Sequence, residues 1–202
     1  MKKILLAAFP IAALALIPLK PLSDPLPIGS PIPSPEVKMK DISGTEISFK
    51  DAQKKNGLLV VFSCNTCPVV KRLQSRLNEV SKYALEHNIG VILLNPNEAY
   101  RNKGDSYDDM KDYAKQNCFN CYYVLDENSA MADKFGANRT PELFLFGSDE
   151  KLAYHGAIDD NSNSEEGVTR KHAITAIDEM SAGKEISMKE TRSVGCTIKR
   201  KN

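Results

Sequence analysis

The strongest constraint on the fold is a pair of cysteines placed between a buried strand and a helix. Leu58–Phe62 is a continuous apolar run, which is typical of a strand covered on both faces. Cys64-Asn65-Thr66-Cys67-Pro68 follows it, and apolar residues then recur at helical spacing as far as Ala84. A second apolar run at 91–94 predicts the next buried strand. Strand, helix and strand in this order predict a right-handed parallel crossover in an α/β fold.

The spacing of the two cysteines indicates redox chemistry. Cysteines three positions apart at the start of a helix can close a small disulfide ring, and the free N–H groups there stabilise a thiolate and lower its pKa. We expect the first cysteine to face solvent and the second, one turn into the helix, to be shielded. This predicts Cys64 as the attacking thiolate and Cys67 as the thiol that resolves the mixed disulfide. A structural zinc half-site or an inert pair is the alternative.

The remaining pattern predicts a single domain over residues 36–202. Its hydrophobic periodicity and turn residues indicate short strands and helices in alternation, with no internal repeat. In chain order we expect an N-terminal hairpin (37–40 and 46–49), a helix from Tyr107, a strand at 122–125, a short helix at 129–135, a second hairpin (143–146 and 152–155) and a last helix at about 168–182.

The N-terminal 35 residues predict export. Met1-Lys2-Lys3 followed by an apolar run to Ile17 is typical of a secretory signal, with an uncleaved membrane anchor as the alternative. Residues 18–35 contain seven prolines, which predicts a stiff linker or a disordered mature N-terminus. We therefore expect a periplasmic or other extracytoplasmic location, with a membrane tether as an open alternative.

The net charge and the number of cysteines exclude two classes of protein. The formal net charge of +1 excludes a nucleic-acid-binding protein that works by bulk basicity. The chain has five cysteines, too few to staple 202 residues as a disulfide scaffold. Because the number is odd, at least one sulfur stays free, pairs with another molecule or binds something else.

The segment Phe62-Ser63-Cys64-Asn65-Thr66-Cys67-Pro68-Val69-Val70-Lys71 resembles a signature of the thioredoxin-like superfamily. Within it, the chain resembles the redoxin branch of alkyl hydroperoxide reductase and thiol-specific antioxidant proteins, and most specifically its peroxiredoxin-like thioredoxin family proteins. Three further segments match in order: Thr140–Phe146, Tyr154–Asp160 and Gly195–Lys199. The resemblance covers about residues 28–200.

This resemblance implies a thioredoxin-like fold, with a central mixed sheet flanked by helices and an N-terminal β-hairpin. It implies that Thr140-Pro141 is a cis-proline segment that faces the cysteine pair and holds an extended substrate beside Cys64. The implied partners are protein thiols or disulfides or a redox partner protein, without a cofactor. Two features depart from the family: the strand before Cys64 lacks the usual buried acid, which acts as a proton acceptor for Cys67, and Arg139 stands where the family has a cysteine. Arg139 is either a surface cation or a group that lowers the pKa of Cys64.

The resemblance does not explain Cys118 and Cys121, and it gives no role to Cys196, although Cys196 lies in one of the matching segments. Cys118-Phe119-Asn120-Cys121 is a second Cys-x-x-Cys, for which a local structural disulfide and a redox relay to the first pair are both open. A four-cysteine zinc site is disfavoured because the two pairs are too far apart in the sequence. Cys196 is interpreted either as buried packing or as a thiol within reach of the active site.

The histidines and acidic clusters predict no metal site. His87, His155 and His172 are scattered and are expected at the surface or at edges. The acidic residues are expected on solvated faces, because their spacing lacks a calcium-loop pattern. They are Asp105, Asp108, Asp109, Asp112, Asp159 and Asp160.

Together these patterns predict an exported thiol–disulfide oxidoreductase. A peroxiredoxin-like thiol peroxidase is the first alternative, but the peroxidase signature requires proline seven positions and threonine or serine three positions before its cysteine. Gly57 and Val61 occupy these positions before Cys64, and Val60 and Cys64 occupy them before Cys67. A non-catalytic metal- or partner-binding thioredoxin-like module is the second alternative.

Overall fold

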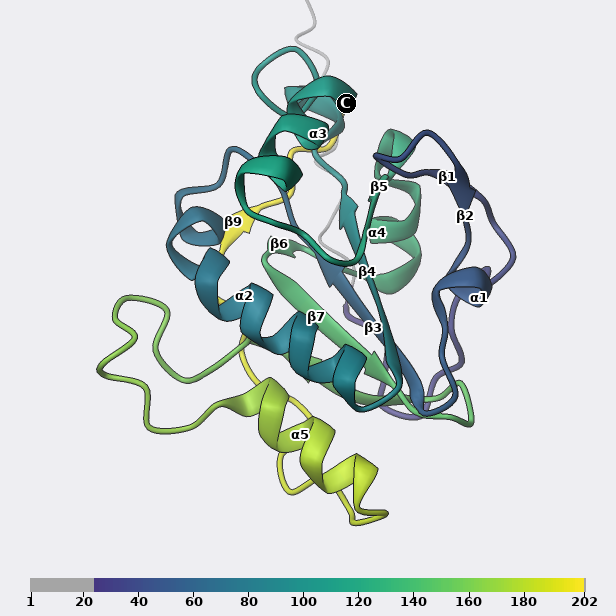
Figure 1. Cartoon of the computed structure of the whole chain (residues 1–202), viewed down its shortest axis with the longest axis vertical. Helices are drawn as coiled ribbons and strands as arrows, with labels where there is room; N and C mark the ends of the chain where they lie inside the picture. Colours follow the sequence, from purple (N-terminus) through teal and green to yellow (C-terminus); the bar gives the residue numbers. More distant parts are fainter. Residues whose placement is uncertain (1–23, 202) are drawn as a thin grey trace, which may run out of the picture.

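The computed structural model describes residues 24–201, in which β3 (Gly57–Phe62) is the middle strand of a five-stranded sheet of order β5-β4-β3-β7-β8 (Figure 1). The strands β4 and β5 run parallel to β3, whereas β7 is antiparallel to β3 and to β8. This arrangement confirms the predicted central mixed sheet and the parallel crossover. The other four strands are β4 (Ile89–Asn95), β5 (Tyr122–Leu125), β7 (Glu142–Phe146) and β8 (Leu152–Gly156).

Helices cover both faces of the sheet. The long helix α2 (Pro68–Glu86) packs with α5 (His172–Ser181) on one face, and α3 (Tyr107–Gln116) adds to the same hydrophobic core. The short helices α1 (Phe49–Ala52) and α4 (Ala130–Phe135) pack on the other face, as Figure 1 shows. Two single-turn 3₁₀ helices lie at Glu98–Tyr100 and Glu127–Ser129.

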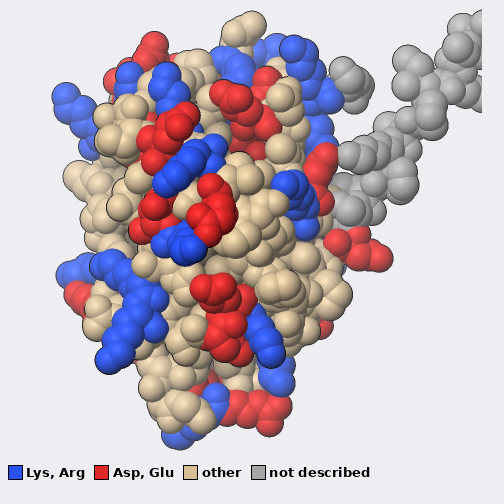
Figure 2. Space-filling view, turned by 90° about the vertical axis from the view of Figure 1, so that its right-hand side faces the viewer, with Lys and Arg blue, Asp and Glu red and all other residues tan. Residues whose placement is uncertain are grey.

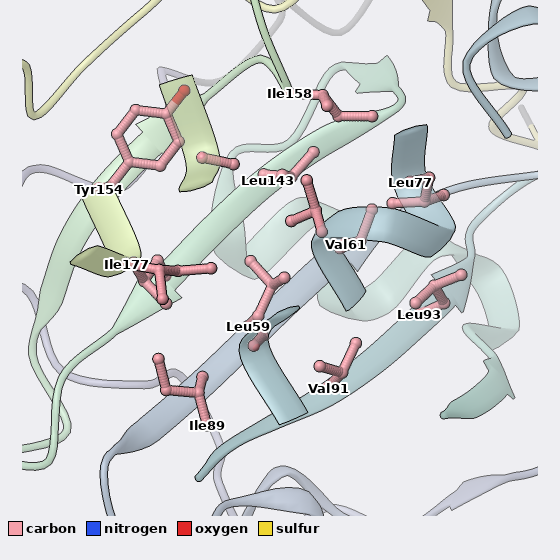
Figure 3. Packing of buried hydrophobic residues seen from close by; sticks show 14 of the residues in the cluster. Leu59, Val61, Leu77, Ile89, Val91, Leu93, Leu143, Tyr154, Ile158 and Ile177 are labelled. Carbon is pink, nitrogen blue, oxygen red and sulfur yellow. The ribbon is translucent and has the colours of Figure 1, made fainter. Parts of the chain in front are cut away.

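The alternation of side chains along β3 divides the interior into two cores. Leu59 and Val61 point toward α2 and α5, and Figure 3 shows them among the side chains of that core. Leu58, Val60 and Phe62 belong to the opposite core, with the aromatic rings of α1 and α4. All five are at most 1% exposed, which explains why the strand reads as a continuous apolar run.

The predicted N-terminal hairpin is present. It consists of β1 (Met39–Lys40) and β2 (Glu46–Ile47), which pair antiparallel with Met39 opposite Ile47. Its turn is stabilised by Asp41, whose carboxylate accepts the backbone N–H of Ser43 at 2.9 Å and that of Tyr123 at 2.8 Å. The hairpin is thereby joined to β5, and the predicted fold class is confirmed.

The proline-rich segment differs from the predicted linker where it is described. The signal peptide or anchor predicted at residues 1–17, and the linker as far as residue 23, lie outside the described residues. Residues 24–35, by contrast, pack on the domain: the N–H of Leu26 donates to the carbonyl of Phe135, and the N–H of Gly29 donates to that of Leu152. Ile32 is only 5% exposed and contributes to the core. Residues 24–35 therefore pack along the surface of the domain and do not form a separate linker.

Two short strands were not predicted. They are β6 (Arg139–Thr140) and β9 (Cys196–Thr197), which pair antiparallel although they are far apart in the sequence. In Figure 1, β9 lies beside β6 near the start of α2. The last helix is also shorter than the predicted 168–182, because residues before His172 form an irregular loop.

One face of the molecule shows no single dominant charge. On the face shown in Figure 2, basic and acidic side chains are interspersed over the whole outline. Among the described helices, none has the length and apolarity required to cross a membrane.

The close packing of α1 on β4 leads to a stability prediction. A Cβ on Gly90 would lie 1.8 Å from the carbonyl oxygen of Ala52, so Gly90→Ala should destabilise the fold by about 3 kcal/mol or more, as expected for overpacking against the backbone. Gly183→Ala is the matched control: at φ +66° with open space around its Cβ, it should cost only about 1 kcal/mol. Urea unfolding followed by circular dichroism measures both, and equal losses would contradict the packing argument.

Candidate active site

The Cys64–Cys67 loop lies at the carboxyl end of the central strand, where the sequence predicted it. Ser63 extends the strand by donating its N–H to the carbonyl of Leu94 at 2.8 Å. Cys67 is the N-cap residue of α2, and Pro68 occupies the first helical position. Proline suits that position because it lacks an N–H that the helix would leave unpaired.

The cis-proline segment touches both cysteines. The Thr140–Pro141 peptide bond is cis, and Thr140 is fully buried. Cys64 Sγ lies 3.3 Å from the hydroxyl oxygen of Thr140, and Cys67 Sγ lies 3.3 Å from its carbonyl oxygen. The structure thus brings together all four residues to which the sequence assigned catalysis and substrate binding.

Cys67 forms a disulfide with Cys196 rather than with Cys64. The two Cα atoms are 6.0 Å apart, and 129 positions separate the residues in the chain. Cys64 carries a free thiol beside this bond, in a small cluster that contains all three sulfurs. The sequence had indicated Cys196 only through its family-like Gly-Cys-Thr-Ile-Lys segment, without a partner.

The environment of Cys64 corrects two expectations. The first cysteine was expected to face solvent, but Cys64 is 0% exposed. Its thiol was expected to have a lowered pKa, but burial raises the pKa above its ordinary value, and the negative charge of Asp105 raises it further. The hydrogen bond with the Thr140 hydroxyl acts in the opposite direction, because it stabilises the thiolate. In this state Cys64 is therefore held as a thiol.

The buried carboxylate of Asp105 anchors the cysteine loop through hydrogen bonds. Asp105 was expected on a solvated face, yet it is 0% exposed. It accepts the backbone N–H of Asn65 at 2.7 Å and the hydroxyl of Thr66 at 2.6 Å. The side-chain amides of Asn95 and Asn97 also donate to it, at 2.9 and 3.0 Å. Asp105 thus fixes the two residues between the cysteines, and its only signal in the sequence was a polar stretch after an apolar strand.

The side chain of Asn65 is held as firmly as its backbone. The Tyr123 hydroxyl donates to Asn65 Oδ1 at 2.8 Å, and Asn65 Nδ2 donates to the carbonyl of Gly104 at 3.0 Å. Tyr123 itself is fully buried and accepts from Asn95 at 3.1 Å. The loop between the cysteines is therefore supported by β4, β5 and the segment before α3.

A second buried carboxylate fixes the approach to the cis-proline. Glu142 accepts the N–H groups of Asn138 and Arg139 at 2.7 and 2.8 Å, and its other oxygen lies 2.8 Å from His155 Nε2. His155 is only 7% exposed and so does not lie at the surface, but β8 is an outer strand of the sheet, which agrees with the other expectation for His155, a position at an edge. Arg139 is exposed and donates to the carbonyl of Gly195, which directs it toward the C-terminal segment.

Another acidic residue that was expected to be solvated is also buried. Asp159 is 8% exposed and forms an ion pair with Arg76 of α2 at 2.5 Å. Asp159 lies in the loop after β8, so the pair ties that loop to the helix that carries Cys67. Next to it, a cavity of about 350 Å³ opens between Pro141, the loop at 157–163 and the C-terminal segment at 191–194.

The second cysteine pair lies apart from this site. Cys118 and Cys121 are both free, so the local disulfide, one of the two interpretations left open by the sequence, is not formed in this structure. The Cys121 thiol hydrogen-bonds Ser81, and burial raises its pKa to about 12. Since Ser81 is about 20 Å further along α2 than Cys67, direct exchange between the pairs is excluded in this conformation. Within residues 24–201, no group of three or more His, Cys, Asp or Glu side chains is placed to hold a metal ion.

The sheet order, the cis-proline and the position of the cysteine loop define a thioredoxin-like protein. The sequence profile of the AhpC/TSA family matches residues 28–155, more than half of the chain. The chain therefore belongs to the AhpC/TSA family. The matched range includes the cysteine loop and the cis-proline and ends before Cys196. Among functionally curated proteins, none matches the chain significantly.

Solved structures support the same fold. An uncharacterized conserved protein from Geobacillus kaustophilus is 28% identical, with a TM-score of 0.81 over 89% of this chain and 95% of that one. A hypothetical protein from Sinorhizobium meliloti is 24% identical, with a TM-score of 0.80 over 89% and 97%. A peroxidoxin from Mycobacterium tuberculosis is similar in fold, at 15% identity and a TM-score of 0.56 over 77% and 96%.

The contacts of Asp105 lead to a prediction about Cys64. Asp105→Asn removes a negative charge that raises the pKa of Cys64, so that pKa should fall. The substitution also replaces an acceptor oxygen with a donor, which should cost about 1–3 kcal/mol of stability. Peptide-mapped alkylation of Cys64 as a function of pH measures the pKa. Asp108→Asn, on an exposed side chain of α3, is the control and should change neither quantity.

Proposed function

We propose that the protein is an exported thiol–disulfide oxidoreductase that uses Cys64 and Cys67 on protein substrates. The observation that carries the proposal is the meeting of three sulfurs at one cis-proline: Cys64 as a thiol, and Cys67 already joined to Cys196 in a disulfide. Thiol–disulfide exchange requires a thiol beside a disulfide. Membership of the AhpC/TSA family agrees with thiol-based chemistry at this loop.

In the proposed reaction, the Cys64 thiolate attacks one sulfur of a substrate disulfide. A bond forms between Cys64 and that sulfur, and the other substrate sulfur leaves as a thiolate and takes up a proton. This second step requires Cys67 as a free thiol, so the reaction starts from protein whose Cys67–Cys196 disulfide has been reduced by a dithiol redox partner, which is itself oxidised to a disulfide. Cys67 then attacks Cys64, breaks the bond between Cys64 and the substrate and gives up its proton to the released substrate sulfur, which leaves a Cys64–Cys67 disulfide. The Thr140 hydroxyl, 3.3 Å from Cys64 Sγ, is placed to donate a hydrogen bond to the thiolate.

Protein substrates are proposed because the site has main-chain groups that can hydrogen-bond a peptide, in addition to the cysteine sulfurs. β6 ends at Thr140, next to Pro141, and an extended chain already pairs with it in the structure. Such an edge recognises a peptide through main-chain hydrogen bonds. Export is proposed from the basic start and apolar run of residues 1–17, which lie outside the described residues.

The alternatives receive less support from the geometry. A peroxidase needs a cation that polarises the peroxide beside its cysteine, and the nearby Arg139 donates to Gly195 instead. A metal-binding module needs free thiols in a ligand cluster, whereas Cys67 is engaged in a disulfide. Rapid consumption of hydrogen peroxide by the purified protein would favour the peroxidase.

The proposal is tested by disulfide exchange with insulin. Cys64→Ser should lower the rate by about a hundredfold or more, because the attacking sulfur is lost. Cys118→Ser, which changes an exposed cysteine remote from the site, should leave the rate unchanged. If Cys64→Ser retains the full rate, the assignment of Cys64 as the nucleophile is wrong.

A further inference from the structure

We propose that Cys196 is a third redox-active cysteine and that strand β9 is an internal substrate of the Cys64–Cys67 site. The inference deepens the proposed function and rests on it. In this structure Cys196 is bonded to Cys67, and it packs against the cluster that contains the free thiol of Cys64. The disulfide can therefore move within the protein.

The step is an intramolecular exchange. The Cys64 thiolate attacks Cys67 Sγ, forms the Cys64–Cys67 bond and breaks the Cys67–Cys196 bond. The electron pair of the broken bond stays on the Cys196 sulfur, which takes up the proton that Cys64 has given up. One thiol and one disulfide are present before and after the step, so it needs no external oxidant or reductant.

The C-terminal segment occupies the edge that the proposed function assigns to a substrate. In the antiparallel pairing of β9 with β6, Cys196 stands opposite Thr140 and Thr197 stands opposite Arg139. Thr140 is the residue that contacts both Cys64 and Cys67. The segment thus presents its cysteine to the site in an extended conformation, beside the cis-proline.

Gly195 allows this close approach. A Cβ at position 195 would lie 2.2 Å from the carbonyl oxygen of Thr140 and 3.1 Å from the nitrogen of Pro141. No side chain fits there without displacing the strand. A protein substrate that takes the place of β9 in the same register should accordingly carry glycine immediately before its cysteine.

The segment is anchored on both sides of Cys196. Beyond it, the N–H of Ile198 donates to the carbonyl of Asn138, and Ile198 is buried. Before it, the Thr191 hydroxyl contacts the hydroxyl of Tyr154 at 2.7 Å and accepts the N–H of Ala157 at 2.9 Å. When the disulfide opens, these anchors keep Cys196 near Cys67, so the reverse exchange is intramolecular and has a high effective concentration.

The test is to label thiols in the oxidised full-length protein with N-ethylmaleimide and to map them by mass spectrometry. In the wild type, both Cys64 and Cys196 should be labelled, each in a different molecule, because each is the free thiol of one disulfide isomer. In Cys64→Ser, Cys196 has no internal partner that can release it, and its labelling should fall about tenfold or more. If Cys196 stays unlabelled in the wild type until a reductant is added, the disulfide is purely structural and the proposal is overturned.

A second variant tests the role of the strand without touching a sulfur. Gly195→Ala should weaken the pairing of β9 with β6 and increase the Cys196-labelled fraction of the oxidised protein. Gly183→Ala, which lies away from the cis-proline, is the control and should leave that fraction unchanged. An unchanged fraction in a folded Gly195→Ala protein would show that the strand does not control the exchange.

The result of the thiol-labelling test can be distinguished from the result of the insulin test, which addresses the proposed function. If Cys64→Ser abolishes exchange with insulin while Cys196 of the wild type is never labelled, only the internal-substrate inference fails. If Cys64→Ser keeps the full rate with insulin, the proposed function fails, whatever the labelling of Cys196 shows.

Discussion

The burial of β3 on both of its faces determines where everything else in the site lies. β4 and β7 flank the strand, and helices cover its two faces. The chain therefore leaves the sheet at the carboxyl end of β3, where α2 begins. Cys64 and Cys67 lie at that point. The same pairing of β3 with β7 sets Phe62 opposite Glu142, the residue after Pro141, and so brings the cis-proline to the cysteines.

Buried carboxylates give the site its rigidity. The apolar strand β3 has no acid before the cysteines, but Asp105 contacts the same loop from the segment before α3. Its charge, the burial of Cys64 and the Thr140 hydroxyl together set the protonation of the thiol. Glu142 similarly organises the turn before Pro141. Reactivity at Cys64 thus depends on how open the site is, since burial is the main reason for its raised pKa.

The parts that the sequence predicted are those with a local signal. An apolar run, a Cys-x-x-Cys before proline and a helical period specify β3 and α2, and Thr140-Pro141 is recognised because threonine, proline and an apolar strand are adjacent. The Cys67–Cys196 bond has no such signal, since it depends on the path of a chain segment 129 positions away. Asp105 and Asp159 were misplaced for a related reason: the sequence pattern alone does not reveal when a polar side chain finds partners inside the fold.

The segment between α5 and β9 has a consequence for solubility. It runs beside β8, where the N–H of His155 donates to the carbonyl of Lys189 and the N–H of Thr191 donates to the carbonyl of His155. An uncovered outer strand is a template for pairing with another molecule, and here the chain's own backbone occupies it. Since these bonds lie before Cys196, opening the disulfide leaves them intact. Reduction of the Cys67–Cys196 disulfide would therefore not uncover a sheet edge that promotes aggregation.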